Sequence, residues 1–71
     1  MALSEKIRIL LIKRDNISEA ELARRMGTTP QNLNRLMKKN NFSEKELVKI
    51  AEALDCTFTG TFTMNDTGEE V

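Results

Sequence analysis

The feature that most constrains this sequence is a helix end and a helix start placed close together near its middle. Gly27 follows a segment with helical periodicity and is suited to a helix C-terminus. Pro30 is suited to the first turn of a new helix, where its missing N–H is not needed, and Thr29 is suited to cap that helix. Because only Gly27, Thr28 and Thr29 separate the two segments, we predict two helices joined by a tight turn.

Three residues around this turn have the sizes that close helix packing needs. Ala23 is small enough to let the second helix approach the first, and Gly27 permits a backbone conformation that larger residues avoid. Leu33 is placed to anchor the underside of the second helix in a core. Together these residues predict a helix-turn-helix.

Other capping signals extend the helical prediction over most of the chain. Ser18 with Glu21, and Ser43 with Glu46, each match the spacing of an N-terminal capping box. Apolar residues recur at helical spacing after each start. We expect four helices, at about residues 4–14, 18–26, 29–39 and 43–55, with an inward face that includes Ile7, Leu10, Leu11, Leu33, Leu36, Met37, Leu47, Ile50 and Leu54.

After Asp55 the apolar period changes from that of a helix to that of a strand. Residues 56–64 alternate, with threonines on one face, and predict one C-terminal β-strand. No second strand is expected in the chain, so we predict antiparallel pairing with the same strand of a second copy. An edge strand lying on the helices is the alternative. The residues expected to form the dimer contact are Thr57, Phe58, Thr59, Thr61, Phe62 and Met64.

Composition limits the possible functions. A chain of 71 residues forms one domain. With one cysteine, Cys56, and no histidine, we expect no internal disulfide, no metal, no cofactor and no enzymatic activity. No stretch approaches the roughly 20 apolar residues of a membrane span, so we expect a cytoplasmic protein. A chain without a second domain is also not expected to bind a small-molecule effector.

The charges are unevenly distributed although they sum to zero, with 11 basic and 11 acidic residues. No acidic residue occurs from Leu22 to Ser43, a segment that contains five arginines and lysines. The final residues, 65–71, are predicted to form a turn and then a frayed acidic tail. The basic segment is typical of a nucleic-acid contact, although a solvated helix face is an alternative.

The segment Leu22–Leu36, LARRMGTTPQNLNRL, resembles the helix-turn-helix of phage-repressor-like proteins of the Cro/Xre type. The resemblance covers residues 4–55 and leaves the predicted strand outside. It implies a mostly α, compact, lambda-repressor-like fold of four helices, with a DNA-binding domain at 1–55. The residue patterns described above add a dimerisation strand at 56–64 and an acidic tail at 65–71. The resemblance also implies a sequence-specific DNA-binding transcriptional regulator, with repression as the expected effect and a homodimer as the expected state.

In this geometry the helix at 29–39 enters the major groove of double-stranded DNA with its first residues near the base edges. The residues expected to contact bases are Thr29, Gln31, Asn32 and Arg35. Those expected to contact phosphates are Thr28, Arg24, Lys38 and Lys39, with Thr28 using its hydroxyl or its backbone amide.

Alternatives remain open for two of these residues and for the whole protein. Thr29 is also explained as a helix cap, and Asn32 as a solvated helix residue. At the level of the whole protein, the chain is alternatively a protein-interaction module, or the antitoxin of a toxin pair that also binds its own promoter.

Overall fold

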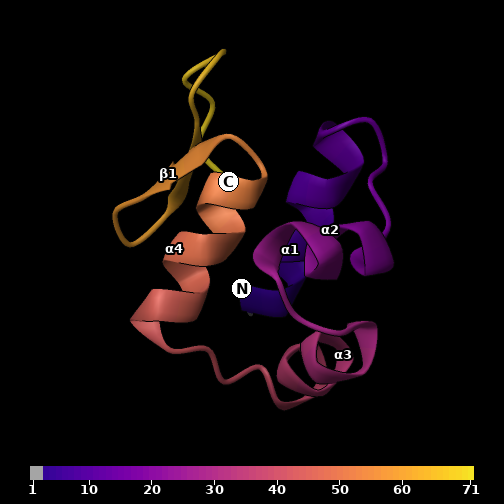
Figure 1. Cartoon of the computed structure of the whole chain (residues 1–71). Coiled ribbons are helices and arrows are strands. Elements are labelled where there is room, and N and C mark those ends of the chain that lie inside the picture. Colours follow the sequence, from indigo (N-terminus) through magenta and orange to yellow (C-terminus); the bar gives the residue numbers. More distant parts are fainter. Residues whose placement is uncertain (1–2) are drawn as a thin grey trace.

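The computed structural model describes residues 3–71, and within them it contains the four predicted helices followed by two short strands (Figure 1). The elements are α1 (Leu3–Lys13), α2 (Glu19–Met26), α3 (Pro30–Lys39), α4 (Glu44–Ala53), β1 (Cys56–Phe58) and β2 (Phe62–Met64). Residues 1–2 of the predicted 1–55 domain lie outside the described residues. None of the helices in this part of the chain has the length and apolar content needed to cross a bilayer.

Side-chain caps begin α2, α3 and α4. The Oγ atoms of Ser18, Thr29 and Ser43 each accept a hydrogen bond from the backbone amide three residues later. At Ser43 the predicted capping box is complete, because the Glu46 carboxylate also accepts from the Ser43 N–H at 2.8 Å.

At Ser18 the prediction of a complete capping box is wrong. The carboxylate of Glu21 accepts hydrogen bonds from the side chains of Arg24 and Arg25 on the next turn of α2. Charged donors make stronger hydrogen bonds than a backbone amide does, which explains why the carboxylate turns toward the arginines.

Each helix is followed by a residue with left-handed backbone. These residues are Asp15 and Asn16 after α1, Gly27 after α2, Asn40 after α3 and Asp55 after α4. At Gly27, where φ is 77°, the chain turns sharply enough for the Thr28 N–H to reach the carbonyl of Ala23 at 2.9 Å. The turn therefore has the tight geometry that Gly27 and Pro30 predict.

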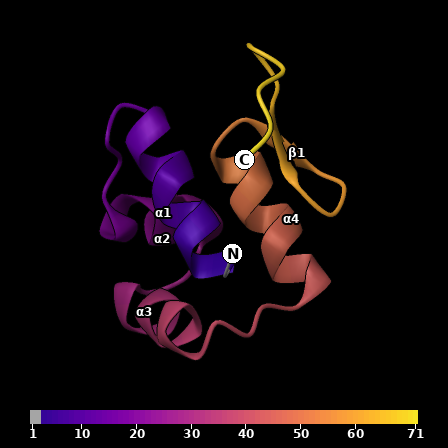
Figure 2. The same cartoon turned by 180° about the vertical axis from the view of Figure 1, so that it is seen from behind.

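The four helices and the hairpin share one core. Ala23, predicted to allow close packing of the two helices, and Leu33, predicted to anchor the second of them in the core, are both completely buried. Figure 2 shows α1 on the near side, with α2 and α3 to one flank and α4 and the strands to the other. The core includes Ile7, Leu10, Leu11, Leu22, Ala23, Leu33, Met37, Leu47, Ile50, Ala51, Leu54, Cys56, Phe62 and Met64.

The prediction of one continuous strand at 56–64 is wrong, because this segment folds back on itself as a hairpin. β1 and β2 pair antiparallel, with Thr57 opposite Thr63 and Phe58 opposite Phe62. The turn contains Gly60, whose φ of 89° is one that a strand residue does not adopt. A glycine inside an alternating pattern marks such a break.

The in-and-out alternation survives the change from strand to hairpin. Phe58 and Phe62 are directly opposed across the ladder, so both lie on the inner face and their ring centroids are 5.0 Å apart. The same pattern of side chains is compatible with a continuous strand and with this hairpin. Periodicity alone therefore could not separate the two folds.

The C-terminal segment is also ordered, so the prediction of a frayed tail is wrong. It runs along the outer edge of β2, where the Met64 N–H donates to Glu69 at 2.9 Å and the Val71 N–H donates to Phe62 at 2.8 Å. Lys13 on α1 forms an ion pair with Glu69. The C-terminal segment is thus bound to both β2 and α1.

One arginine joins three parts of the fold. Arg14 binds both carboxylate oxygens of Asp66 at 2.9 Å, and it donates to the backbone carbonyls of Leu54 and Asp55 at the end of α4. The hydrogen bonds between Arg14 and Asp66 raise the pKa of Arg14 and lower that of Asp66. The end of α1, the end of α4 and the C-terminal segment are therefore held together by a single guanidinium group.

Candidate nucleic-acid interface

Helix α3 has one apolar face and one polar face. Leu33, Leu36 and Met37 are buried against the rest of the domain. On the opposite face Gln31 and Arg35 are exposed, one helical turn apart. The two residues expected most strongly to contact bases thus project from the same side of α3, away from the core.

Asn34 belongs to this exposed face, although it was not among the predicted site residues. It lies three residues after Gln31 and is exposed. Residues three apart are neighbours on a helix, so the spacing from Gln31 was a signal that could have identified it. Three amide or guanidinium side chains therefore gather on the outer face of α3.

The two threonines before α3 have structural roles in the turn. Thr29 is the N-cap, and its Oγ1 accepts from the Asn32 amide at 3.1 Å. The Thr28 N–H donates to the carbonyl of Ala23 inside the turn. This amide and the hydroxyl are the two groups of Thr28 that the sequence predicts as phosphate contacts. This amide is therefore engaged within the domain, which leaves the Thr28 hydroxyl as the group for a phosphate contact.

Asn32 is partly buried, whereas Gln31 and Arg35 are exposed, so its side chain lies closer to the core than theirs. Its Nδ2 donates to Thr28 Oγ1 at 2.8 Å, and its Oδ1 accepts from Nη2 of Arg35. The side chain thus links the turn before α3 to the exposed arginine.

A second asparagine joins α3 to α1. The left-handed residue Asn40 at the C-terminus of α3 accepts a hydrogen bond through Oδ1 from the Ser4 N–H, at 2.9 Å. This amide belongs to the first turn of α1 and has no partner within its own helix. The contact spans 36 residues of sequence and could not be found from local patterns.

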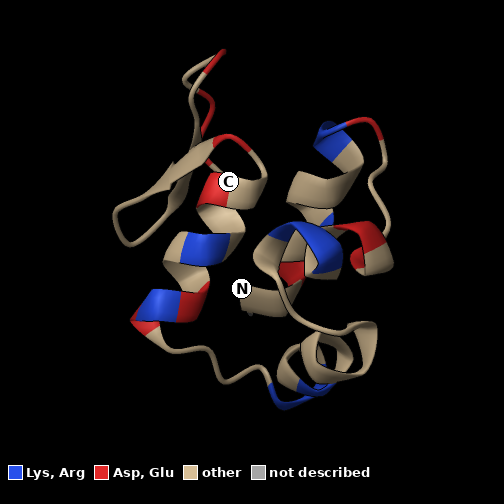
Figure 3. Cartoon of the chain, in the orientation of Figure 1, with Lys and Arg blue, Asp and Glu red and all other residues tan. Residues whose placement is uncertain are grey.

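The remaining charges of α3 are basic. Lys38 and Lys39 are exposed in its last turn. Figures 1 and 3 show α3 at the opposite end of the molecule from the acidic C-terminal segment. The zero net charge therefore conceals a separation of charge, in which the acidic tail lies away from the exposed face of α3.

Arg24, expected to contact phosphate, is exposed on α2 but already has an anionic partner. It shares Glu21 with Arg25, whose Nη1 also donates to the Ala53 carbonyl at 3.2 Å. Hydrogen bonds from Arg24 and then Arg25 lower the pKa of Glu21 to about 2, so the carboxylate is ionised at neutral pH. Its negative charge offsets part of the positive charge that α2 presents.

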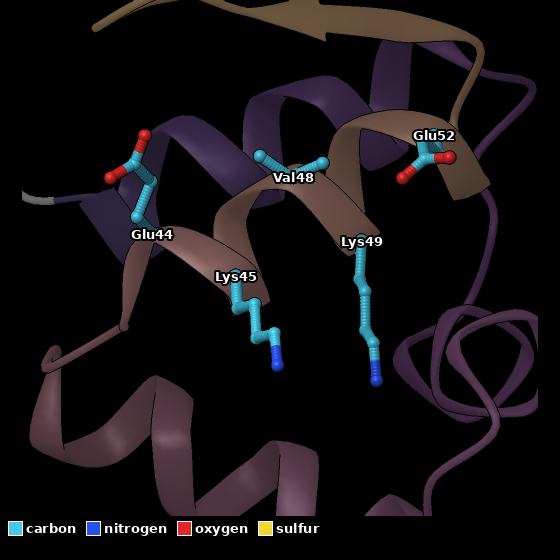
Figure 4. Close-up of a pocket in the computed structure, with 5 residues that line it drawn as sticks. All are labelled: Glu44, Lys45, Val48, Lys49 and Glu52. Atoms are coloured by element: carbon cyan, nitrogen blue, oxygen red, sulfur yellow. The ribbon is translucent and has the colours of Figure 1, made fainter.

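A surface hollow of about 410 Å³ lies along α4 (Figure 4). It is lined by Glu44, Lys45, Val48, Lys49 and Glu52, all from this one helix. A ligand site is normally a concave pocket with polar groups converging from several elements. This hollow has no second wall, so α3 remains the surface on which recognition chemistry is concentrated.

Comparison with known proteins gives one match. A family model described as Cro/C1-type HTH DNA-binding domain matches residues 6–63 of the chain. No curated protein and no solved structure matches the chain. The matched range extends beyond residue 55 and includes β1 and part of β2, so the hairpin lies inside the region of similarity.

Proposed function

This chain belongs to the family of Cro/C1-type helix-turn-helix DNA-binding domains, and from that premise we propose that it is a sequence-specific regulator that inserts α3 into the major groove. The observation that carries the proposal is the exposed face of α3. Gln31, Asn34 and Arg35 project from it together, while Leu33 on the opposite face is completely buried. Amide and guanidinium groups can each make paired hydrogen bonds to a purine edge.

Contacts with phosphates supply the second part of the proposal. Lys38 and Lys39 extend the polar face of α3 toward the backbone of the duplex, and the Thr28 hydroxyl lies at the start of the helix. Arg24 is on the neighbouring helix, with its charge partly offset by Glu21. Such contacts orient the domain on any duplex and make its affinity depend on salt.

Repression by a homodimer is the simplest regulatory mode for such a domain. Occupancy of a promoter is sufficient to exclude another protein, and a twofold dimer reads an approximate palindrome. The backbone groups of Phe62 and Met64 are engaged by residues 69–71. A dimer contact through this region would therefore use β1, the other strand of the hairpin, in place of the continuous ribbon expected from the sequence.

Binding to duplex DNA as a function of salt tests the proposal. A domain that neutralises phosphates loses affinity linearly on a logarithmic plot, with a slope of about −0.9 per phosphate contact. We expect measurable binding to random duplexes with such a slope, and tighter binding to duplexes selected from a randomised library. Absence of both kinds of binding would favour a protein-interaction module that does not bind DNA.

A sedimentation experiment on the same protein tests the homodimer separately. We expect a shift from monomer to dimer across the micromolar range. A chain that binds selected DNA but stays monomeric would contradict the dimer without affecting the proposed mode of DNA reading.

A further inference from the structure

The exposed guanidinium of Arg35 is held by a hydrogen bond to another side chain of α3. Its Nη2 donates to Oδ1 of Asn32, and Nδ2 of Asn32 donates to Thr28 Oγ1 at 2.8 Å. The Asn32 backbone N–H is in turn bonded to the hydroxyl of Thr29. Two consecutive side-chain hydrogen bonds thus connect the tight turn to the tip of an exposed side chain, and a third holds the Asn32 backbone to the same turn.

We propose that Asn32 is a positioning residue, which holds Arg35 in the orientation that reads a guanine, and that Asn32 does not itself read a base. The inference rests on the proposed function and specifies how α3 achieves selectivity. Arg35 is the group that contacts DNA, Asn32 sets its direction, and Thr28 sets the direction of Asn32.

The chemistry of the two side chains supports this division. A paired contact with adenine needs the oxygen and the nitrogen of an asparagine amide to face the base together. In Asn32 these atoms instead face Arg35 and Thr28. A guanidinium has five N–H groups, so the bond from Nη2 to Asn32 leaves enough donors for a fork on guanine.

Holding Arg35 before DNA arrives also has an energetic consequence. A long arginine side chain loses rotamer freedom when it forms a paired contact. Part of that loss is already incurred in the free protein when Asn32 restrains the guanidinium, so binding to the correct base becomes more favourable. Binding to a base that cannot accept both hydrogen bonds from Arg35 is not strengthened by the restraint. The network therefore increases discrimination at one base pair.

The test compares discrimination at single base pairs. Duplexes selected by the wild-type protein from a randomised library provide the starting site, and each base pair is then replaced in turn. Arg35→Ala identifies the base pair that Arg35 reads, because discrimination there should fall by about 5-fold or more. Asn32→Ala should reduce discrimination at that same base pair by about 2–10-fold, as expected for residues coupled in one network. When Asn32→Ala is added to the Arg35→Ala variant, it should cause no further loss of discrimination.

Two further variants separate positioning from general damage to the helix. Thr28→Val removes the hydroxyl that orients Asn32, and it should reduce discrimination at the same base pair. Asn41→Ala is the control, since Asn41 is an exposed asparagine just after α3 that lies outside the proposed base-reading face, and discrimination at the Arg35 base pair should stay unchanged. If Asn32→Ala relaxes a different base pair, or weakens binding to every duplex equally, the inference is wrong.

A measurement without DNA keeps this inference distinct from the proposed function. Nuclear relaxation of the Arg35 Nε–H in the free protein should show restricted motion in the wild type and increased motion in Asn32→Ala. The exposed Arg8 on α1 serves as an internal reference that should not change. Equal mobility of Arg35 in the two proteins would overturn the positioning role. Failure to bind any selected duplex would instead overturn the proposed function.

Discussion

At the scale of single residues, the polar side chains of α3 differ in what they bind in the free protein. Thr29 caps the helix and Asn32 links Thr28 to Arg35. Gln31 and Asn34 lie on the exposed face. The polar groups of Thr29 and Asn32 are used inside the domain, whereas Gln31 and Asn34 lie on the face that we propose to contact base edges.

Substitutions on α3 should separate base contacts from phosphate contacts. We expect Gln31→Ala and Arg35→Ala to weaken binding to a selected duplex by about 1–3 kcal/mol each, with little effect on random DNA. Lys38→Ala should weaken binding to both kinds of duplex and reduce the salt slope by about one unit. Titrations at several salt concentrations measure both effects. Equal losses on selected and random DNA for Arg35→Ala would reassign it as a phosphate contact.

Glu21→Gln should strengthen non-specific binding to DNA. The wild-type carboxylate is ionised at neutral pH, and its two arginine partners lower its pKa further, to about 2. Its removal leaves Arg24 and Arg25 without their anionic partner and raises the net charge by one. We expect tighter binding to random duplexes and a steeper salt dependence. Glu52→Gln, an exposed change of equal charge on α4, is the control for the general effect of net charge.

The sequence predicted which face of α3 is exposed but could not predict how Asn32 is oriented. Burial of Leu33, Leu36 and Met37 follows from helical periodicity, and that burial places Gln31 and Arg35 outside. The orientation of Asn32 depends on two side-chain hydrogen bonds to Thr28 and Arg35. Such bonds depend on rotamers, which a pattern of residue types does not specify.

At the scale of elements, local signals predicted the helices well because helices begin and end through local contacts. Ser43 and Glu46 form the capping box within a single turn, and Gly27 adopts the left-handed backbone that ends α2. The hairpin was missed for the opposite reason. Gly60 was counted as one more inward residue of an alternating strand, whereas its positive φ turns the chain back on itself.

Gly27 variants should measure the cost of the tight turn. An added Cβ would meet no heavy atom within 4 Å, so the cost comes from backbone strain at φ 77° and not from a clash. We expect Gly27→Ala to lower the free energy of unfolding by about 1–2 kcal/mol. Gly27→Asn should lower it least, because asparagine tolerates this conformation, and the β-branched Gly27→Val most.

Thermal melts measure this series. In a domain of this size each kcal/mol corresponds to roughly 4–8 °C in Tm. The order glycine, asparagine, alanine, valine is expected from the most to the least stable. An alanine variant that melts with the wild type would contradict the strain at this turn.

At the scale of the whole molecule, long-range ion pairs help to hold the C-terminal segment against the end of α1. Arg14 and Asp66 are 52 residues apart in sequence, and Lys13 and Glu69 are 56 apart. An acidic end with one apolar residue gives no local sign of order, which is why the sequence predicted fraying. The tail is held by ion pairs with the end of α1 together with backbone hydrogen bonds to β2.

Asp66→Asn should destabilise the domain in a pH-dependent way. Arg14 lowers the pKa of Asp66, so the folded state favours its ionised form. This contribution is present above the ordinary pKa of 3.8 and is lost as the pH falls through the lower pKa of the folded state. We therefore expect the variant to melt below the wild type at pH 7, with the difference narrowing below about pH 4.

Glu69→Gln is the matched control for this prediction. It removes the carboxylate partner of Lys13, whose ion pair is more exposed than that of Arg14. Exposed ion pairs contribute little to stability, so its effect on Tm should be the smaller of the two. A pH-independent difference between Asp66→Asn and the wild type would show that the carboxylate charge is not the stabilising feature.

The left-handed residues after the helices are positions at which the stability of this fold could be increased. Asp15, Asn16, Asn40 and Asp55 adopt a backbone that only glycine adopts without a steric penalty. Asn40 and Asp55 use their side chains in hydrogen bonds, whereas Asp15 is exposed at the surface. Replacing Asp15 with glycine removes the strain of its left-handed backbone and gives up only an exposed side chain. An engineer seeking a more stable version of this domain would begin at that loop, because it lies outside the face of α3 that we propose to read DNA.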